Sequence, residues 1–438
     1  MTHYSIELDT CSQNSSCDPE RAALKTRERT MRTPKNIMHK HAISIALATA
    51  LVGSVTSQMA YAEGLTEALT SGKASVNLNL RYESVEQENA VEDASALTLR
   101  TLLAYDTGSY KGFSAKVEME DTRIVLGQGD YTVGPSGYNL GQYSVIADPE
   151  HTELDQGYIQ YINDTFSAKL GRQVITMDGH RFVGHVGWRQ DRQTFDALSA
   201  KYAPVKNLTL QYAYITQRNR IFAQDADLDA KDHLINASYK TSAGTLTGYG
   251  YLLEVDNGTA NALDTFGVSF TGSTKAGDTK ILYRAEYASQ SSETEAADFD
   301  VDYINLEIGA VFSGITAKVG YEVLGSDDGA FGFSTPLATL HKFNGWSDQF
   351  LGTPSQGLVD TSVSLAGKAL GGGWKVIYHN FEADDASDTV DDLGSELNLS
   401  YVKKYGRHYS AGIKYAAYSA GDIKVDADKI WVWVGVKF

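Results

Sequence analysis

The chain has 438 residues, with 55 acidic side chains against 38 basic ones and a net charge of −17. This acidic balance argues against a nucleic-acid partner, because binding to a phosphate backbone requires a basic surface. The cysteines, Cys11 and Cys17, both lie near the N-terminus, so the rest of the chain is expected to fold without disulfide bonds. After residue 62 no run of about 20 apolar residues predicts a membrane-spanning helix.

The first 62 residues carry the pattern of an export signal. A basic region, a short apolar stretch over residues 42–55 and the small-x-small sequence Ala60-Tyr61-Ala62 follow one another. The segment before Met31 lacks hydrophobic periodicity and is interpreted as an upstream extension. We therefore predict that residues 1–62 are removed and that residues 63–438 form one domain.

From residue 74 onward, stretches of about ten alternating apolar and polar residues recur between turn clusters, which predicts strands with one wet and one apolar face. Strands are expected to begin near residues 74, 95, 113, 155, 165, 194, 207, 232, 243, 263, 278, 301, 314, 357, 373, 393, 408 and 428. Short connections alternate with long ones, and the long ones are residues 124–154, 173–193, 217–231, 254–262, 289–300, 324–356 and 383–392.

This pattern predicts an all-β fold, a transmembrane antiparallel β-barrel of about 18 strands, in the range 16 to 20, with short periplasmic turns and long extracellular loops. The alternative is a soluble sandwich or propeller, but strands in soluble sheets average only about five or six residues. The 26 tyrosines fall often near predicted strand ends, where a phenol can rest between lipid and headgroups. The predicted location is the bacterial outer membrane.

The charged phase of the strands is expected to face the lumen, because a cation that faces lipid at mid-depth costs about 2 to 4 kcal/mol. In the first strand this phase contains Arg81 and Glu83, in the second Arg100, and in a later strand Arg284. A barrel of this size is too wide for side chains alone to fill, so an aqueous passage is predicted.

Residues 171–198 are the most informative segment, because they contain four arginines and no lysine. Arginine matches carboxylates with a planar fork and stays charged when it is partly desolvated. One interpretation is an anion-selecting constriction; the other is that these arginines pair internally with Asp178, Asp191, Asp196, Glu118 and Glu120 and only brace the loop. The candidate pore residues are Arg81, Arg100, Arg172, Arg181, Arg189, Arg192, Arg218, Arg220 and Arg284.

The same segment resembles the alginate export family of outer-membrane proteins. The resemblance rests on Gly171-Arg172-Gln173, Asp178-Gly179, Arg181, Gly184, Trp188-Arg189 and Thr194-Phe195-Asp196. It implies a large single-chain barrel whose positively charged constriction passes a linear polyuronate, with Arg172, Arg181, Arg189 and Arg192 in or beside that constriction. The rest of the chain agrees with the family in its barrel pattern.

We therefore predict a monomeric, non-enzymatic channel for anionic solutes or a linear anionic polysaccharide; the alternatives are a general or small-acid or sugar uptake porin and a plugged barrel with a surface role. Expected partners are outer-membrane lipid, lipopolysaccharide and the barrel assembly machinery, which is expected to recognise Phe438 on the closing strand. Trp431 and Trp433 share the phase of Lys437 and are placed at the lumen wall. His180 and His185 match no zinc spacing, and neither a metal nor a cofactor is predicted.

Overall fold

The computed structural model describes residues 59–134 and 138–438. The chain divides into two units, Met1–Tyr61 and Ala62–Phe438, and the second unit contains all the strands. Helix α2 (Met59–Thr70) precedes the first strand. The predicted cleavage position after Ala62 lies within α2, and the apolar part of the predicted signal lies outside the described residues. Cleavage there remains a prediction.

Eighteen antiparallel strands form one closed sheet. The first nine are β1 (Lys73–Gln87), β2 (Ala94–Asp106), β3 (Phe113–Asp130), β4 (His151–Ile162), β5 (Phe166–Gln173), β6 (Thr194–Tyr202), β7 (Leu208–Asn219), β8 (Leu228–Lys240) and β9 (Gly244–Leu253). The others are β10 (Ala262–Ala276), β11 (Thr279–Glu293), β12 (Asp298–Phe312), β13 (Ile315–Leu324), β16 (Leu358–Ala369), β17 (Gly372–Glu382), β18 (Asp392–Tyr405), β19 (Tyr409–Ser419) and β20 (Ala427–Lys437).

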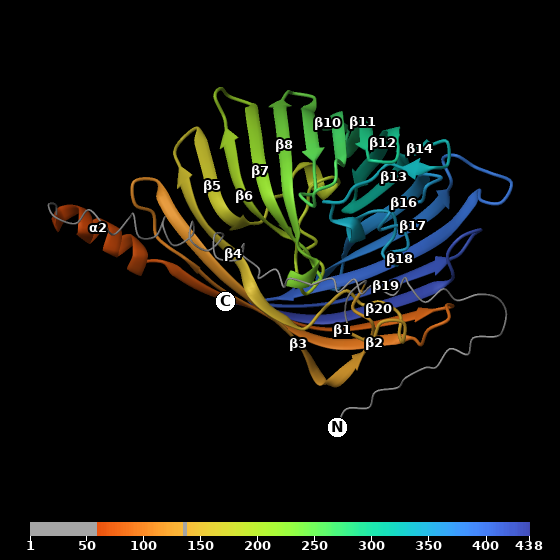
Figure 1. Ribbon diagram of the computed structural model, residues 1–438, viewed down its shortest axis with the longest axis horizontal. Helices are drawn as coiled ribbons and strands as arrows, with labels where there is room; N and C mark the ends of the chain where they lie inside the picture. The colour runs from red at the N-terminus through yellow and green to blue at the C-terminus, as the bar shows by residue number, and fades with distance from the viewer. Residues whose placement is uncertain (1–58, 135–137) are drawn as a thin grey trace, which may run out of the picture. The chain divides into compact units, whose positions relative to one another are not determined.

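The barrel closes where the first strand pairs with the last. In Figure 1 the orange β1 lies beside the blue β20, and their register places Leu80 opposite Val434 and Arg81 opposite Trp433. Backbone hydrogen bonds between Val76 and Phe438 extend this pairing to the last residue. Closure leaves no unpaired sheet edge, which is the condition for strands to cross a bilayer.

The two phases of each strand face opposite environments, as predicted. On β1, Leu80 is 40% exposed, whereas Arg81 and Glu83 are each 1% exposed. On β3, Val117 and Met119 are exposed and Glu118 and Glu120 are buried. The apolar phase therefore covers the outer surface and the charged phase faces the interior.

Tyrosines mark the outer surface at the end of the barrel that carries the short turns. Tyr105, Tyr202, Tyr239, Tyr405 and Tyr409 are all exposed and lie at or next to strand ends there. Such a girdle is typical of the membrane interface of outer-membrane barrels. No helix among the described residues is long and apolar enough to cross a membrane.

Every predicted strand is present, and each begins within four residues of its predicted start. The differences lie at the long connections, where β3, β7 and β11 continue to Asp130, Asn219 and Glu293. The polar composition of these segments predicted loops. The backbone hydrogen bonds between strands do not require apolar side chains, so the strands continue through them. The sequence did not predict helix α2, the small hairpin of β14 (Ser326–Asp327) and β15 (Phe331–Gly332), or the short 3-10 helices η1 (Asp178–His180), η2 (Gln224–Ala226) and η3 (Leu340–Lys342).

Candidate functional site

Two connections fold into the barrel interior. We call residues 174–193, between β5 and β6, the first inner loop, and residues 325–357, between β13 and β16, the second inner loop. Phe182 of the first packs against Phe333 of the second and against Tyr249 and Tyr303 of the barrel wall. These rings belong to a buried apolar cluster that extends along the inner face of the sheet. The two loops and the wall therefore share one core.

The arginines of the first inner loop are paired with carboxylates of three different wall regions. Arg181 Nε lies 2.7 Å from Glu322 of β13. Arg189 Nη1 lies 3.0 Å from Glu83 of β1, and its Nη2 lies 2.8 Å from Asp348 of the second inner loop. Because these strands are far apart in the sheet order, the pairs stretch the loop across the lumen.

Arg192 completes this set. Its guanidinium contacts both Glu118 of β3 and Asp155 of β4. Of the internal partners predicted for the segment, Glu118 and Asp196 are confirmed as ion-pair partners of arginine, whereas Asp191 and Glu120 contact His151 and Asp178 accepts from Asn236. Ion pairing is thus the immediate role of these arginines.

The wall arginines are also paired. Arg172 Nε lies 2.8 Å from Asp196, Arg218 Nη2 2.7 Å from Asp232, and Arg284 Nη2 2.5 Å from Glu286. Arg81 pairs with Asp148, which lies in the connection between β3 and β4. Removing one partner of a buried pair costs about 3 to 5 kcal/mol, because the remaining charge stays buried.

Arg100 and Arg220 differ from the other seven candidates, because neither makes an ion pair with a described residue. Arg100 is buried on β2 and donates from Nη1 to the carbonyl oxygen of Arg189 at 3.4 Å. Arg220 follows β7 and is one of the residues that line a cavity. Burial, followed by the neighbouring Arg218, lowers the pKa of Arg220, and the nearby Asp227 offsets these effects only in part.

An aromatic cluster fastens the first inner loop to the closing strand. Trp188 stacks on His341 of the second inner loop at 5.0 Å and packs edge-on against Trp431 and Trp433 of β20. Lys414 of β19 lies 4.2 Å from the centre of the Trp188 ring, a cation–π contact. Trp431 is completely buried, so the predicted position of the β20 indoles at the lumen wall is confirmed.

Two cavities lie on opposite sides of the inner loops. The loop-side cavity has a volume of about 470 Å³ and is lined by Gln87, Arg189, Arg220, Asp348, Lys424 and Lys429 among others, so it reaches the strand ends that carry the long loops. The turn-side cavity, about 480 Å³, includes Arg181, Arg284, Thr316, Lys318, Lys342 and Lys375, and it extends toward the short turns.

Basic side chains outnumber acidic ones in both cavities. The loop-side cavity has Arg189, Arg220, Lys424 and Lys429 against Asp348 alone. The turn-side cavity has five lysines and arginines against Asp178, Glu307, Glu322 and Asp360. The linings of both cavities thus carry a positive excess, although the net charge of the whole chain is −17.

A family model described as alginate export matches residues 73–323, which is more than half of the chain. The chain belongs to the alginate export family. The match contains the first inner loop, where the motif resemblance was found. No curated protein matches the chain in sequence.

Solved structures share the fold of this alginate export family member. Pseudomonas aeruginosa OccK9 (OpdG) is 13% identical, with a TM-score of 0.67 over 85% of this chain and 99% of that one. Acinetobacter baumannii OccAB4 gives the same values. P. aeruginosa OpdK, solved with vanillate, is 12% identical, with a TM-score of 0.66 over 84% and 98% of the two chains. The protein is an outer-membrane channel of the porin type.

Several residues of the site were not predicted. Asp148, Glu322 and Asp348 pair with candidate arginines of the wall and the first inner loop, and Trp346 and Lys414 belong to the aromatic cluster. Glu322 and Lys414 lie in the lumen phase of their strands, so alternation could have found them. Asp148, Asp348 and Trp346 lie in long connections, where no periodic pattern shows which side chains turn inward.

Proposed function

We propose that this channel passes anionic solutes by passive diffusion, and that the loop-side cavity is the place where anions are selected. The observation that carries the proposal is the excess of four basic side chains over one acidic side chain there. Two of the four, Arg220 and Lys424, make no ion pair with a described residue, so their charge is available to a solute. Lys424 lies in the connection between β19 and β20, at the rim of the barrel.

Eight of the nine candidate arginines divide into two roles under this proposal, and the ninth, Arg100, is buried and donates to the first inner loop. Arg172, Arg181, Arg189, Arg192, Arg218 and Arg284, together with Arg81, are paired and hold the walls and the inner loops in place. Arg220, with the lysines of both cavities, attracts the solute. Arginine-lined walls and mixed charge support weak binding, which a conducting pore needs because a tightly held ion does not leave.

Two kinds of anionic solute fit this mechanism, a linear polysaccharide and a small organic acid, and a different observation favours each. Membership of the alginate export family favours a linear anionic polysaccharide. The cavity volumes of about 470 and 480 Å³ suit a small solute, and OpdK was solved with a carboxylate, vanillate. Small-acid uptake is therefore the second candidate.

We further propose that the barrel acts as a monomer, contacts lipopolysaccharide with its outer surface and is recognised by the assembly machinery through Phe438. The Phe438 side chain is 60% exposed and stacks on His408 at 4.8 Å. A ring held at the outer edge of the closing strand is accessible to such a partner.

Planar-bilayer recordings test the proposed selectivity. The wild-type barrel is expected to give a stable current whose reversal potential in a KCl gradient indicates preference for chloride, and glucuronate or oligouronate added on the loop side is expected to block it. Arg220→Gln with Lys424→Gln should lower the anion-to-cation permeability ratio about 5- to 25-fold, since one unit charge within about 4 Å of an ion in water contributes about 1 kcal/mol.

Lys206→Gln is the matched control, because Lys206 is exposed in a short turn outside both cavities. It removes one positive charge and should leave the ratio unchanged. Cation preference of the wild-type channel, or an unchanged ratio in the double variant, would refute the proposal. Absence of any stable current would favour a plugged barrel with a surface role.

A further inference from the structure

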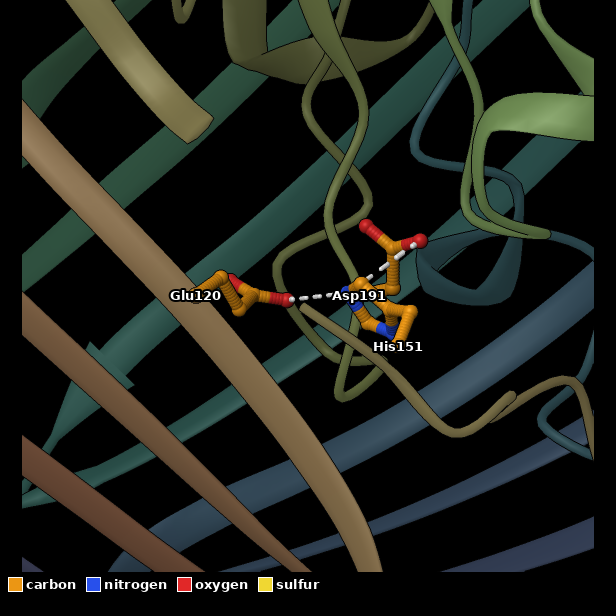
Figure 2. Close-up of side chains that lie close together, drawn as sticks. All are labelled: Glu120, His151 and Asp191. Atoms are coloured by element: carbon orange, nitrogen blue, oxygen red, sulfur yellow. Dashed lines mark ion pairs between the residues drawn. The ribbon is translucent and has the colours of Figure 1, made fainter. Parts of the chain in front are cut away.

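Glu120, His151 and Asp191 meet in the barrel interior from three separate segments (Figure 2). Glu120 belongs to β3, His151 begins β4 and Asp191 belongs to the first inner loop. His151 Nε2 lies 3.6 Å from Glu120 Oε1 and 3.7 Å from Asp191 Oδ2. The residues are 0%, 8% and 1% exposed, respectively, so all three are shielded from bulk solvent.

Four buried polar atoms of this cluster have no hydrogen-bond partner among the described residues. They are both carboxylate oxygens of Glu120, Nε2 of His151 and Oδ1 of Asp191, although Nε2 lies within ion-pair range of Glu120 Oε1 and Asp191 Oδ2. A buried polar atom without a partner costs about 1 to 3 kcal/mol, and more when it is charged. Orphaned atoms converging on one point indicate that something further binds there.

The orientation of the imidazole is that of a metal ligand. His151 Nδ1 lies 3.1 Å from the carbonyl oxygen of Pro149, which can only accept, so the ring donates from Nδ1. A neutral ring then presents the lone pair of Nε2 to the two carboxylates. Metal-binding histidines are typically held by such a hydrogen bond from the other ring nitrogen. Asp191 is held by one backbone hydrogen bond, since its Oδ2, which faces His151, accepts from the backbone nitrogen of Ala223 at 3.2 Å, and its Oδ1 has no partner among the described residues.

The separations fit two ligands of one ion better than they fit hydrogen bonds. Hydrogen bonds from nitrogen to oxygen measure about 2.7 to 3.2 Å. Zinc lies about 2.0 to 2.2 Å from nitrogen and oxygen ligands, so two ligands at tetrahedral to trigonal angles are about 3.3 to 3.7 Å apart. The nitrogen-to-oxygen distances of 3.6 and 3.7 Å agree with this arrangement.

The described arginines near this cluster form no ion pair with its carboxylates, whose negative charge therefore favours binding of a cation. Arg192 acts on Glu120 electrostatically but is already paired with Glu118 and Asp155. Arg100 also acts on Glu120, without an ion pair to it, and its Nε has no partner. Glu153 adds a further negative charge beside Asp191.

We infer that Glu120, His151 and Asp191 form a binding site for one divalent transition-metal ion, for which Zn²⁺ is the probe. Calcium and magnesium prefer oxygen ligands alone, whereas imidazole with carboxylates suits zinc and its neighbours. The bound ion would join the first inner loop to β3 and β4 of the wall. The site would thereby revise the prediction from sequence that the chain has no metal.

Zinc titration of the untagged protein, purified from outer membranes and stripped with chelator, tests the site. One Zn²⁺ per chain is expected, with no displacement by excess Mg²⁺ or Ca²⁺. Glu120→Gln, Asp191→Asn and His151→Gln should each weaken binding at least 10-fold. His408→Gln is the matched control, because His408 is exposed in a short turn and should leave binding unchanged.

His151→Cys, loaded with Co²⁺, gives a direct readout of coordination. Thiolate bound to cobalt produces a charge-transfer absorption that is absent from the wild-type protein, and its appearance supports the site even where a neutral variant fails to fold. The competing explanation is a protonated His151 between two carboxylates. Failure of the wild type to bind Zn²⁺, or binding that all three neutral variants retain, would overturn the inference, as would a folded cysteine variant without the absorption.

Discussion

Replacing Arg189 with methionine is expected to release the first inner loop from the wall. Methionine fills part of the arginine volume but leaves Glu83 and Asp348 without their shared partner. The pKa of Arg189 shows the strength of this environment: burial would lower it, but Glu83, Asp148 and Asp348 raise it above the ordinary value. The variant therefore removes a buried positive charge and leaves two buried carboxylates without the arginine that neutralised them.

The magnitude follows from what remains near each carboxylate. Breaking one side of a buried pair costs about 3 to 5 kcal/mol. Arg81 still lies 3.6 Å from Glu83, and Lys429 lies 3.7 Å from Asp348, so the lower end of the range applies. About 3 kcal/mol corresponds to roughly a 100-fold increase in the population of the open loop, since 1.4 kcal/mol is a factor of ten.

Native-state hydrogen exchange of the first inner loop measures this opening without unfolding the barrel. The amides of Gly184 and Gln193, bonded to Leu337 and His185, are suitable probes. Both should exchange about 100-fold faster in the variant. Arg172→Met is the control, because the Arg172–Asp196 pair is partly exposed and contributes about 1 kcal/mol or less. Unchanged exchange combined with altered ion selectivity would show that Arg189 serves the pore and not the loop.

Two further predictions concern pH and assembly. Burial, with His180 and Arg192, lowers the pKa of His185 to about 4, so the folded loop favours the neutral ring. The neutral ring therefore stabilises the fold fully above the unfolded pKa of about 6.5, and this stabilisation declines as the pH falls toward 4. Melting temperatures should therefore fall less between pH 7.5 and 4 in His185→Gln than in the wild type, and equal decreases would contradict this. Deleting Phe438 should reduce the amount of folded barrel in the outer membrane, as seen by heat-modifiable gel mobility. Because the ring is 60% exposed, the barrels that do form should melt close to the wild-type temperature, and unchanged yield would remove Phe438 as the assembly signal.

The sequence predicts the barrel well because each strand is a local pattern. The alternation around Arg81 and around Glu118 determines which side chains face the lumen, and the tertiary structure follows it. The pairing of arginines is not local. Arg189 and Glu83 are 106 residues apart, and only the path of the inner loop joins them. Glu120, His151 and Asp191 likewise come from three segments whose spacing matches no motif, so their meeting depends on strand register and loop packing together.

Both ends of the sheet contribute to the contacts that hold the inner loops. Arg189 binds Glu83 on the first strand, while Trp188 packs on Trp431 of the last. These two anchors become neighbours only when β1 and β20 join, so the complete set of inner-loop contacts exists only in the closed barrel.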